Sequence, residues 1–322
     1  MELKGAYRSK ENELNYLTFS QAKNLNKCAR SFMEEFLLKQ AGKPVEVPHL
    51  LQAAFDIGTA VEACLVGGTQ GLSDCFKGEE GKLYKKPTKA SIIDHEYYLK
   101  ALSWKANPDN YVGTVTAKLK KVADGPVITK PKTIKSALWQ DTIKYTEALK
   151  AIGDVKWMVE NCQHSQILTS EFGGVRYKSE LDFSSKKHNT IVDLKTSKDP
   201  FSKKWIQRRG LKGHYGSFIE GLDYDLQSFI YREAWLQSFG IKAKYFIVVV
   251  GKSEGTPVEI IDMNDDSKDD YFRELLDTQS SKWQQAKLDG HANIQGCNYC
   301  QSCRASHVPS FKSAVKSSDL WQ

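Results

Sequence analysis

Residues 180–196, which read ELDFSSKKHNTIVDLKT, decide the fold expected for this chain. Apolar and polar residues alternate on both sides of the polar run 184–189, which is typical of two strands joined by a short turn. Because side chains alternate faces along a strand, Asp193 and Lys195 share one face of the second strand. The hairpin places the two strands side by side, so Asp182 is expected to lie near Asp193.

This carboxylate–lysine group predicts a metal-dependent reaction on phosphate. Asp182 and Asp193 would repel each other unless a cation lay between them. A hard divalent ion with oxygen ligands meets that need, Mg²⁺ or Mn²⁺ most naturally. Lys195 would face the same centre, where it could stabilise a developing phosphate charge or orient an attacking water. For Asp193 and Lys195 alone, a solvated hairpin with an Asp–Lys pair is an equal alternative.

The rest of the pattern predicts one α/β domain with a mixed central sheet. A turn followed by a helix is expected over 14–40, with Ser20 as N-cap. Further helices are expected over 50–66, 136–160, 217–239 (long and amphipathic) and 268–287. Strands are expected over 167–172, 175–183, 190–195, 245–250 and 258–261, with a turn at Gly173-Gly174. We divide the single domain into N-terminal helices (1–66), a basic, irregular, partly helical insertion (67–136), a catalytic core (137–290) and a cysteine-containing tail (291–322).

Composition favours a polyanionic partner. The 322 residues are 40% hydrophobic and 26% charged, with a net charge of +7. Each Lys or Arg that neutralises a phosphate releases a counterion, so a basic chain favours nucleic acid. No run approaches the roughly 18 apolar residues of a membrane span, and the N-terminus shows no apolar signal core. We therefore expect a cytoplasmic protein that does not associate with membranes.

The motifs resemble those of the PD-(D/E)xK nucleases. More narrowly, they resemble the phage and prophage RecE-type (exonuclease VIII-like) recombination exonucleases, with kinship to lambda exonuclease. The resemblance rests on 180–183, 192–196, Gly58-Thr59-Ala60-Val61-Glu62 and Gln227-x-x-x-Tyr231. It covers roughly residues 15–305 and is weakest over 67–136. It implies a restriction-endonuclease-like α/β core whose mixed central sheet is flanked by helices.

The resemblance also implies a role for each matching residue. Asp182 and Asp193 would be metal ligands, the backbone carbonyl of Leu194 another, and Lys195 the catalytic lysine. Glu62 stands where RecE-type members usually carry a histidine ligand. This is a departure from the family pattern, although a glutamate is also a suitable oxygen ligand. A plain surface position is less attractive for Glu62, because its neighbours are apolar.

Two further residues are predicted to flank the site. Gln227 and Tyr231 lie at i and i+4, on one face of a helix. In the family such a pair borders the active site and helps to position DNA or the lysine. Ordinary helix packing is the alternative for both.

Three cysteines crowd the C-terminus in a C-x-x-C-x-x-C spacing: Cys297, Cys300 and Cys303. Thiolates at this spacing can bind one soft metal centre, but three ligands leave the site one short. Relatives with a 4Fe–4S cluster join an N-terminal cysteine to such a triplet, and the resemblance assigns that role to Cys28. A Zn²⁺ site with His291 or His307, and unligated thiols, stay open as alternatives.

The resemblance implies an exodeoxyribonuclease that digests linear duplex DNA from 5′ to 3′ and leaves 3′ single-stranded overhangs for recombination. Its partners would be double-stranded DNA ends, a single-strand annealing protein and further copies of itself, in a bacterial host and encoded by a phage. One alternative is an endonuclease, or a CRISPR- or helicase-associated iron–sulfur end-processing nuclease. Another is a non-catalytic DNA-binding protein on a nuclease fold, which the intact Asp182, Asp193 and Lys195 argue against.

Overall fold

The computed structural model describes residues 16–29, 32–33, 49–85, 134–206, 213–288 and 303. Contacts divide the chain into two compact units, one of residues 1–51 and 152–322 and one of residues 52–151. The single nuclease domain stays a prediction. Among the described residues, no helix has the length and apolar character needed to cross a membrane.

A five-stranded mixed sheet forms the centre of the larger unit, in the order β3-β4-β5-β8-β9. Its strands are β3 (Gln163–Phe172), β4 (Val175–Ser185), β5 (Thr190–Ser197), β8 (Lys244–Gly251) and β9 (Val258–Asp262). β5 and β8 run parallel, whereas the other neighbours are antiparallel. The predicted meander, its two later strands and the mixed sheet are therefore confirmed.

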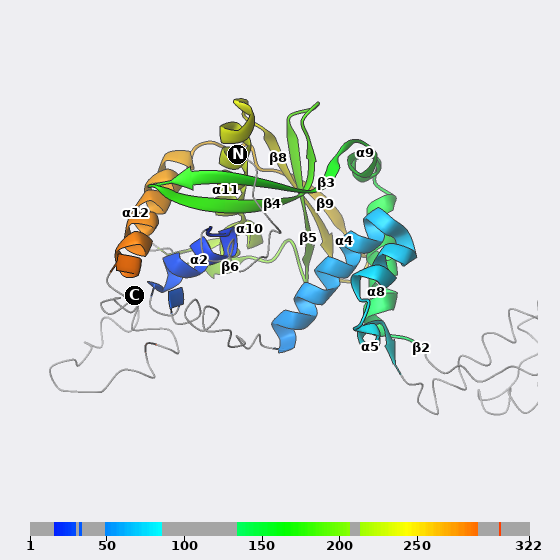
Figure 1. The fold of residues 1–322 in the computed structure, drawn as a ribbon. Coiled ribbons are helices and arrows are strands. Elements are labelled where there is room, and N and C mark those ends of the chain that lie inside the picture. Colours follow the sequence, from blue (N-terminus) through cyan, green and yellow to red (C-terminus); the bar gives the residue numbers. More distant parts are fainter. Residues whose placement is uncertain are drawn as a thin grey trace, which may run out of the picture. The chain divides into compact units, whose positions relative to one another are not determined.

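Helices cover this sheet and close the core. They are α2 (Phe19–Lys27), α9 (Gly153–Asn161), α10 (Phe218–Gly221), α11 (Tyr224–Phe239) and α12 (Asp269–Leu288). α11 and α12 contact β3, and α2 lies against α11 and α12 (Figure 1). Because β5 and β8 are parallel, the chain between them must cross over, and α11 lies in that crossover. The crossover thereby places α11 against the sheet.

The turn at Gly173 and Gly174 is confirmed. Both residues have positive φ, 52° and 75°, as a two-residue hairpin turn between twisted strands requires. Gly173 also has little room for a side chain. A Cβ there would lie 3.0 Å from the Cβ of Ser280 and 3.1 Å from the carbonyl oxygen of Asp277.

The N-cap of the first described helix is Thr18, so the prediction of Ser20 was wrong. The Thr18 hydroxyl accepts the N–H of Gln21 at 3.3 Å, and the Gln21 side chain accepts the N–H of Thr18 at 2.8 Å. This reciprocal pair satisfies two backbone donors at the helix start, which Ser20 in the first turn could not do.

The predicted continuous helix over 217–239 is broken. α10 ends at Gly221, and Asp223 adopts a left-handed conformation (φ 59°, ψ 30°) directly before α11 begins. The amphipathic character is wrong as well, because every residue from Leu226 to Trp235 is buried. Buried polar side chains need partners, and residues outside the helix supply some of them. Arg232, for example, pairs with Asp266 and, at 2.7 Å, with Asp269.

The smaller unit contains α4 (His49–Cys75) from Gln52 onward, α5 (Glu80–Leu83), β1 (Tyr84–Lys85), β2 (Ile134–Lys135) and α8 (Ala137–Lys150). α4 runs past the predicted end at residue 66 into the segment expected to be irregular. It does so with a kink at Gly68 (φ 63°), because Leu72 and Phe76 continue its buried stripe. These two side chains pack with Cys64 and Trp139 in a separate small core.

Candidate active site

The regular pairing of β4 with β5 ends at Phe183 and Val192. Beyond that pair, a side chain replaces the ladder: Oδ2 of Asp182 accepts the backbone N–H of Leu194 at 2.8 Å. The N–H and C=O of one strand residue point to the same side, so the Leu194 carbonyl is expected to face β4 as well. β5 stays paired with β8 as far as Ser197, so only its β4 side loses its strand partner.

Asp193 is the buried centre of the site, with only 1% of its surface exposed. Its Oδ2 lies 2.5 Å from Nζ of Lys195, and its Oδ1 accepts a 3.1 Å hydrogen bond from Nε2 of Gln227. Burial raises the pKa of Asp193 to about 7; Lys195 pulls it down and the charge of Asp182 pushes it up. The Lys195 ammonium alone thus does not bring the pKa of Asp193 back to its usual range. A further positive charge, such as a metal ion, would favour the ionised carboxylate.

Lys195 is less buried than Asp193, with 19% of its side chain exposed. Burial alone lowers its pKa, but the charges of Asp193 and Asp182 outweigh that effect and raise the pKa above its usual range. Its Nζ lies 5.2 Å from the centre of the Tyr224 ring, within reach of a cation–π contact. The geometry therefore holds a charged ammonium next to the carboxylates.

Gln227 and Tyr231 are the predicted flanking pair, and α11 turns both toward β5 and β8. Gln227 touches Asp193 directly through the bond just described. Tyr231 is buried, and its ring lies 6.2 Å from that of Tyr245 on β8. Tyr245 pairs in register with Ile191, two residues before Asp193. The helix thus joins the site through one polar and one aromatic contact.

Two residues of this neighbourhood were missed by sequence reasoning. Tyr224 contacts the Lys195 ammonium, and the Tyr245 side chain is fully buried, with its pKa raised by burial and then by the charge of Asp193. Tyr224 could have been found, because it precedes Gln227 by three residues and Tyr231 by seven, on one helical face. Tyr245 could not, because the strand register that places it is not visible in the sequence.

The donor set suits a hard divalent ion. The site offers the carboxylates of Asp182 and Asp193 and the Leu194 carbonyl, and Mg²⁺ usually takes one or two carboxylates and keeps several waters. Gln227 Oε1 is buried with no hydrogen-bond partner in the described part of the chain, so a further oxygen acceptor lies beside Asp193. No three His, Cys, Asp or Glu side chains of the described residues group around a metal position.

Glu62 lies in the smaller unit, on α4. It is partly exposed between buried neighbours, among them Val61 and Cys64. Its negative charge raises the pKa of Cys75, after the larger effect of burial. Its role as a metal ligand stays a prediction.

A second cluster brings together cysteines from the two ends of the chain. Cys28, directly after α2, and Cys303 are both buried, and their sulfur atoms lie 3.6 Å apart. This separation is far longer than the roughly 2.05 Å of a disulfide, so the two cysteines are not disulfide-bonded to each other. The other predicted ligands, Cys297, Cys300, His291 and His307, lie outside the described residues.

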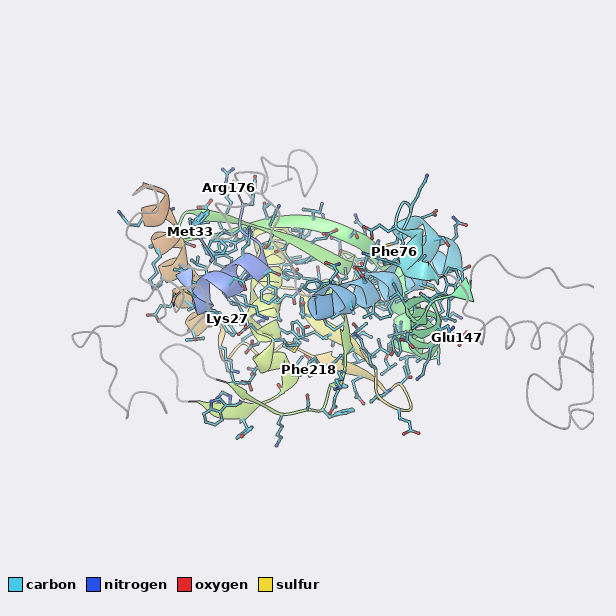
Figure 2. The ribbon with its side chains drawn as sticks, turned by 90° about the horizontal axis from the view of Figure 1, so that it is seen from below. Lys27, Met33, Phe76, Glu147, Arg176 and Phe218 are labelled. Atoms are coloured by element: carbon cyan, nitrogen blue, oxygen red, sulfur yellow. The ribbon has the colours of Figure 1, made fainter. Side chains whose placement is uncertain are left out.

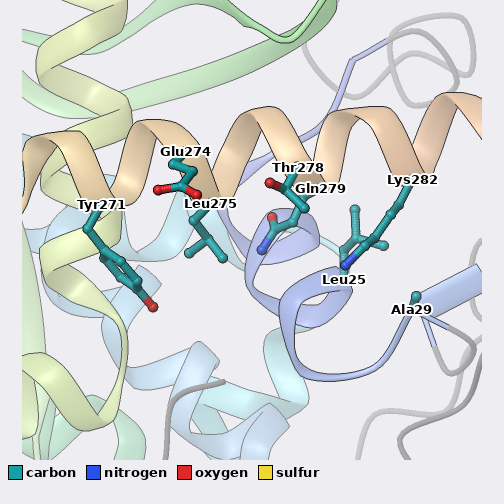
Figure 3. A pocket seen from close by; sticks show the side chains of 8 residues that line it. All are labelled: Leu25, Ala29, Tyr271, Glu274, Leu275, Thr278, Gln279 and Lys282. Atoms are coloured by element: carbon teal, nitrogen blue, oxygen red, sulfur yellow. The ribbon is translucent and has the colours of Figure 1, made fainter. Parts of the chain in front are cut away.

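The structure also has a cavity away from these groups, of about 310 Å³. It opens between α2 and α12 (Figure 3), and its lining residues are Leu25, Ala29, Tyr271, Glu274, Leu275, Thr278, Gln279 and Lys282. None of the predicted site residues lines it. The chemistry is therefore expected at the sheet rather than in this cavity.

Comparison with known proteins identifies the family and the fold of this chain. Residues 18–306 match a family described as a PDDEXK-like domain of unknown function (DUF3799). The chain belongs to this family. A crystal structure described as that of a "Putative exonuclease" from Eubacterium rectale has the same fold, with a TM-score of 0.63 and 18% identity over 99% of this chain and 98% of that one. No curated protein matches the chain. The predicted PD-(D/E)xK fold class is thereby confirmed.

Proposed function

We propose that this PDDEXK-like protein is a metal-dependent deoxyribonuclease that digests linear duplex DNA from its ends. One observation carries the proposal: Asp182, Asp193 and Lys195 converge where β4 and β5 part. Two acidic ligands and a charged lysine beside an open position are what metal-assisted phosphodiester hydrolysis needs. The family match and the fold shared with the Eubacterium rectale protein support the same reaction class.

Each residue has a defined task in this proposal. Asp182 and Asp193, with the Leu194 carbonyl and with Glu62 as a further candidate, would hold Mg²⁺ or Mn²⁺. The bound ion would polarise the attacking water and offset charge on the phosphate. Lys195 would stabilise the negative charge that develops on the scissile phosphate. Gln227 would hold the Asp193 carboxylate in place through its 3.1 Å hydrogen bond. Tyr231 would support α11, the helix that carries Gln227.

The finer activity follows from the resemblance. We propose digestion from 5′ to 3′, which leaves 3′ single-stranded overhangs for a recombination partner such as a single-strand annealing protein. A homo-oligomer that surrounds the duplex would make such digestion processive. The excess of Lys and Arg over Asp and Glu, which gives the chain its net charge of +7, favours binding to the DNA backbone.

The test uses linear duplexes labelled at the 5′ or the 3′ end, with Mg²⁺ and Mn²⁺ compared. An exonuclease of the proposed polarity releases short 5′-labelled products first, leaves closed circular DNA intact and stops with EDTA. Cleavage of the closed circle would instead identify an endonuclease. Binding without cleavage under both metals would reject the enzyme in favour of a DNA-binding protein.

We also propose that Cys28, Cys297, Cys300 and Cys303 hold one metal centre, a 4Fe–4S cluster or Zn²⁺. The 3.6 Å between the Cys28 and Cys303 sulfurs supports it. Two thiolates on one tetrahedral Zn²⁺ lie about 3.8 Å apart, given Zn–S bonds of about 2.3 Å. Such a centre would link the N-terminal helix to the C-terminal tail and stabilise the fold. Anaerobic purification followed by an absorption spectrum and metal analysis distinguishes iron–sulfur, zinc and an empty site.

A further inference from the structure

A short hairpin that sequence reasoning missed carries two exposed aromatic residues, and a third lies just before it. It consists of β6 (Lys204–Ile206) and β7 (His214–Gly216), between the catalytic strand β5 and α10. Trp205 and Tyr215 are 60% and 71% exposed, and Phe201, just before β6, is 65% exposed. They are the most exposed large apolar side chains of the described residues. Clustered apolar exposure of this kind usually marks a binding surface. We call these three residues the aromatic face.

The register of the hairpin explains the exposure. Trp205 and Tyr215 are directly opposed across the two strands, and their rings meet edge to face with centroids 5.3 Å apart. Side chains alternate along a strand, so Ile206 and Gly216 lie on the other face of the hairpin. Ile206 is buried there, and Gly216 leaves space that Ile206 and the Glu220 carboxylate of α10 approach closely. The hairpin is seated by one face and presents the other to solvent.

Phe201 is held outward by its own turn. The side chain of Asp199 accepts the N–H of Phe201 at 2.9 Å, and the Asp199 carbonyl accepts the Ser202 hydroxyl at 3.0 Å. Such side-chain-to-backbone bonds fix a turn without help from the core. The ring is therefore presented by a defined backbone rather than left on a featureless loop.

A continuous series of contacts joins the seated side of this hairpin to the proposed catalytic lysine. Phe218 (labelled in Figure 2) begins α10, which packs against both strands of the hairpin. Its ring lies 6.0 Å from that of Tyr224, and Tyr224 in turn contacts the Lys195 ammonium at 5.2 Å from the ring centre. Lys195 is also only ten positions before Trp205 in the sequence. The hairpin that carries the aromatic face is therefore linked to the active-site region of the same unit through α10.

The charge beside the aromatic face suits a polyanion. Lys198 and Lys203 flank Phe201 in the segment between β5 and β6, and both are exposed. His214 on β7 is exposed too, but it pairs with Ile206 on the opposite face of the hairpin, 3.5 Å from the Glu220 carboxylate, and so adds no charge to the aromatic face. Exposed aromatic rings next to cationic side chains are the combination by which proteins bind single strands, since the rings stack on bases and the cations contact phosphates.

We propose that the aromatic face stacks on unpaired nucleobases at a DNA end, with Trp205 and Tyr215 as the stacking residues. This inference rests on the proposed nuclease function and names the part of the substrate that the hairpin takes. The unpaired bases would be those of an overhang or a frayed terminus. Stacking there would hold the single strand beside Lys195.

The test measures binding without cleavage, in EDTA, by fluorescence anisotropy of labelled oligonucleotides. One duplex carries a thymine overhang, and its match carries abasic sites with the same number of phosphates. The wild-type protein should prefer the overhang that has bases by about tenfold. Trp205→Ala and Tyr215→Ala should remove most of that preference while binding the abasic duplex as the wild type does.

Matched variants separate stacking from other effects. Trp205→Phe keeps an aromatic ring and should retain most of the preference, whereas Trp205→Leu keeps only apolar bulk and should lose it. Trp157→Ala removes a partly exposed tryptophan from α9 and should change nothing. Circular dichroism confirms that each variant folds.

Two results would overturn the proposal. One is an unchanged base preference in both Trp205→Ala and Tyr215→Ala. The other is a change of molar mass in light scattering for these variants, which would assign the face to contact between copies of the chain. This test measures binding and not cleavage, so its outcome is independent of the cleavage experiment. If the protein prefers unpaired bases here but does not cut DNA with Mg²⁺ or Mn²⁺, the nuclease function is refuted and this inference stands.

Discussion

The carboxylate of Asp182 accepts the backbone N–H of Leu194 at the point where β4 and β5 stop pairing. A side chain proposed to bind metal thus also completes the hydrogen bonding of the strand that carries Asp193 and Lys195. The bond fixes the spacing of the two strands and places the Asp182 carboxylate beside Asp193. Strand geometry and site geometry therefore depend on the same atom.

Asp182 variants separate these two tasks. Asp182→Asn keeps an oxygen acceptor for Leu194, so it should unfold in urea like the wild type yet lose Mn²⁺ binding and cleavage. Asp182→Ala leaves that N–H without its partner and should also lower the free energy of unfolding by about 1–2 kcal/mol. Equal stability of the two variants would show that the bond does not matter to the fold. Urea denaturation and isothermal titration with Mn²⁺ provide the readouts.

Lys195→Ala should reduce cleavage of end-labelled duplex by at least about 100-fold, because it removes the charge expected to stabilise the transition state. Duplex binding should change little. Lys187→Ala, in the exposed turn between β4 and β5, is the control and should cleave normally. Full activity of Lys195→Ala would refute the mechanism.

Gln227→Leu should lower kcat/KM about tenfold, since the loss of a hydrogen bond to a charged group is typically worth 1.5–3 kcal/mol. The Mn²⁺ concentration that gives half-maximal activity should rise with it, because Gln227 holds Asp193 in place. Gln237→Leu is matched: this residue lies on the same helix but bonds to the backbone of Glu171 at the surface. Equal kcat/KM and equal Mn²⁺ requirement in the two variants would show that Gln227 does not position Asp193.

Two glycine variants test the account of the fold. Gly173→Ala and Gly240→Ala both place alanine at positive φ, 52° and 72°, which costs about 1–2 kcal/mol in each case. Only Gly173 also meets neighbours, Ser280 and Asp277 of α12 at 3.0 and 3.1 Å. Gly173→Ala should therefore be the less stable of the two in urea denaturation. The opposite order would mean that α12 does not pack on this turn.

High pH should weaken the fold through Tyr177. Burial raises its pKa to about 12, while its hydrogen bond to Ser280 lowers it. The unfolded tyrosine titrates near pH 10. The stabilisation is therefore complete below about pH 10 and is lost as pH rises toward the folded pKa. Tyr177→Phe should flatten the fall in stability between these values, measured by urea denaturation at several pH values. If stability falls with pH as steeply in Tyr177→Phe as in the wild type, groups other than Tyr177 cause the fall.

Local patterns determined much of this protein. Alternation around 184–189 predicted the hairpin, its acidic residues and the lysine, because period two in a strand fixes which side chains share a face. The i, i+4 spacing of Gln227 and Tyr231 predicted a common helix face, because residues four apart in a helix lie about one turn apart. The Gly173-Gly174 turn followed from the positive φ that glycine adopts freely.

Tertiary structure decided what those patterns could not. The burial of α11 on all sides depends on partners such as Asp266 and Asp269, which lie far along the chain from Arg232. The splaying of β4 from β5 and the place of Tyr245 depend on strand register, which arises from packing across the whole sheet. The outward rings of Trp205 and Tyr215 were likewise fixed by which face of a short hairpin α10 covers. Local sequence thus set the residues of the site, and long-range contacts, invisible to periodicity, set their geometry.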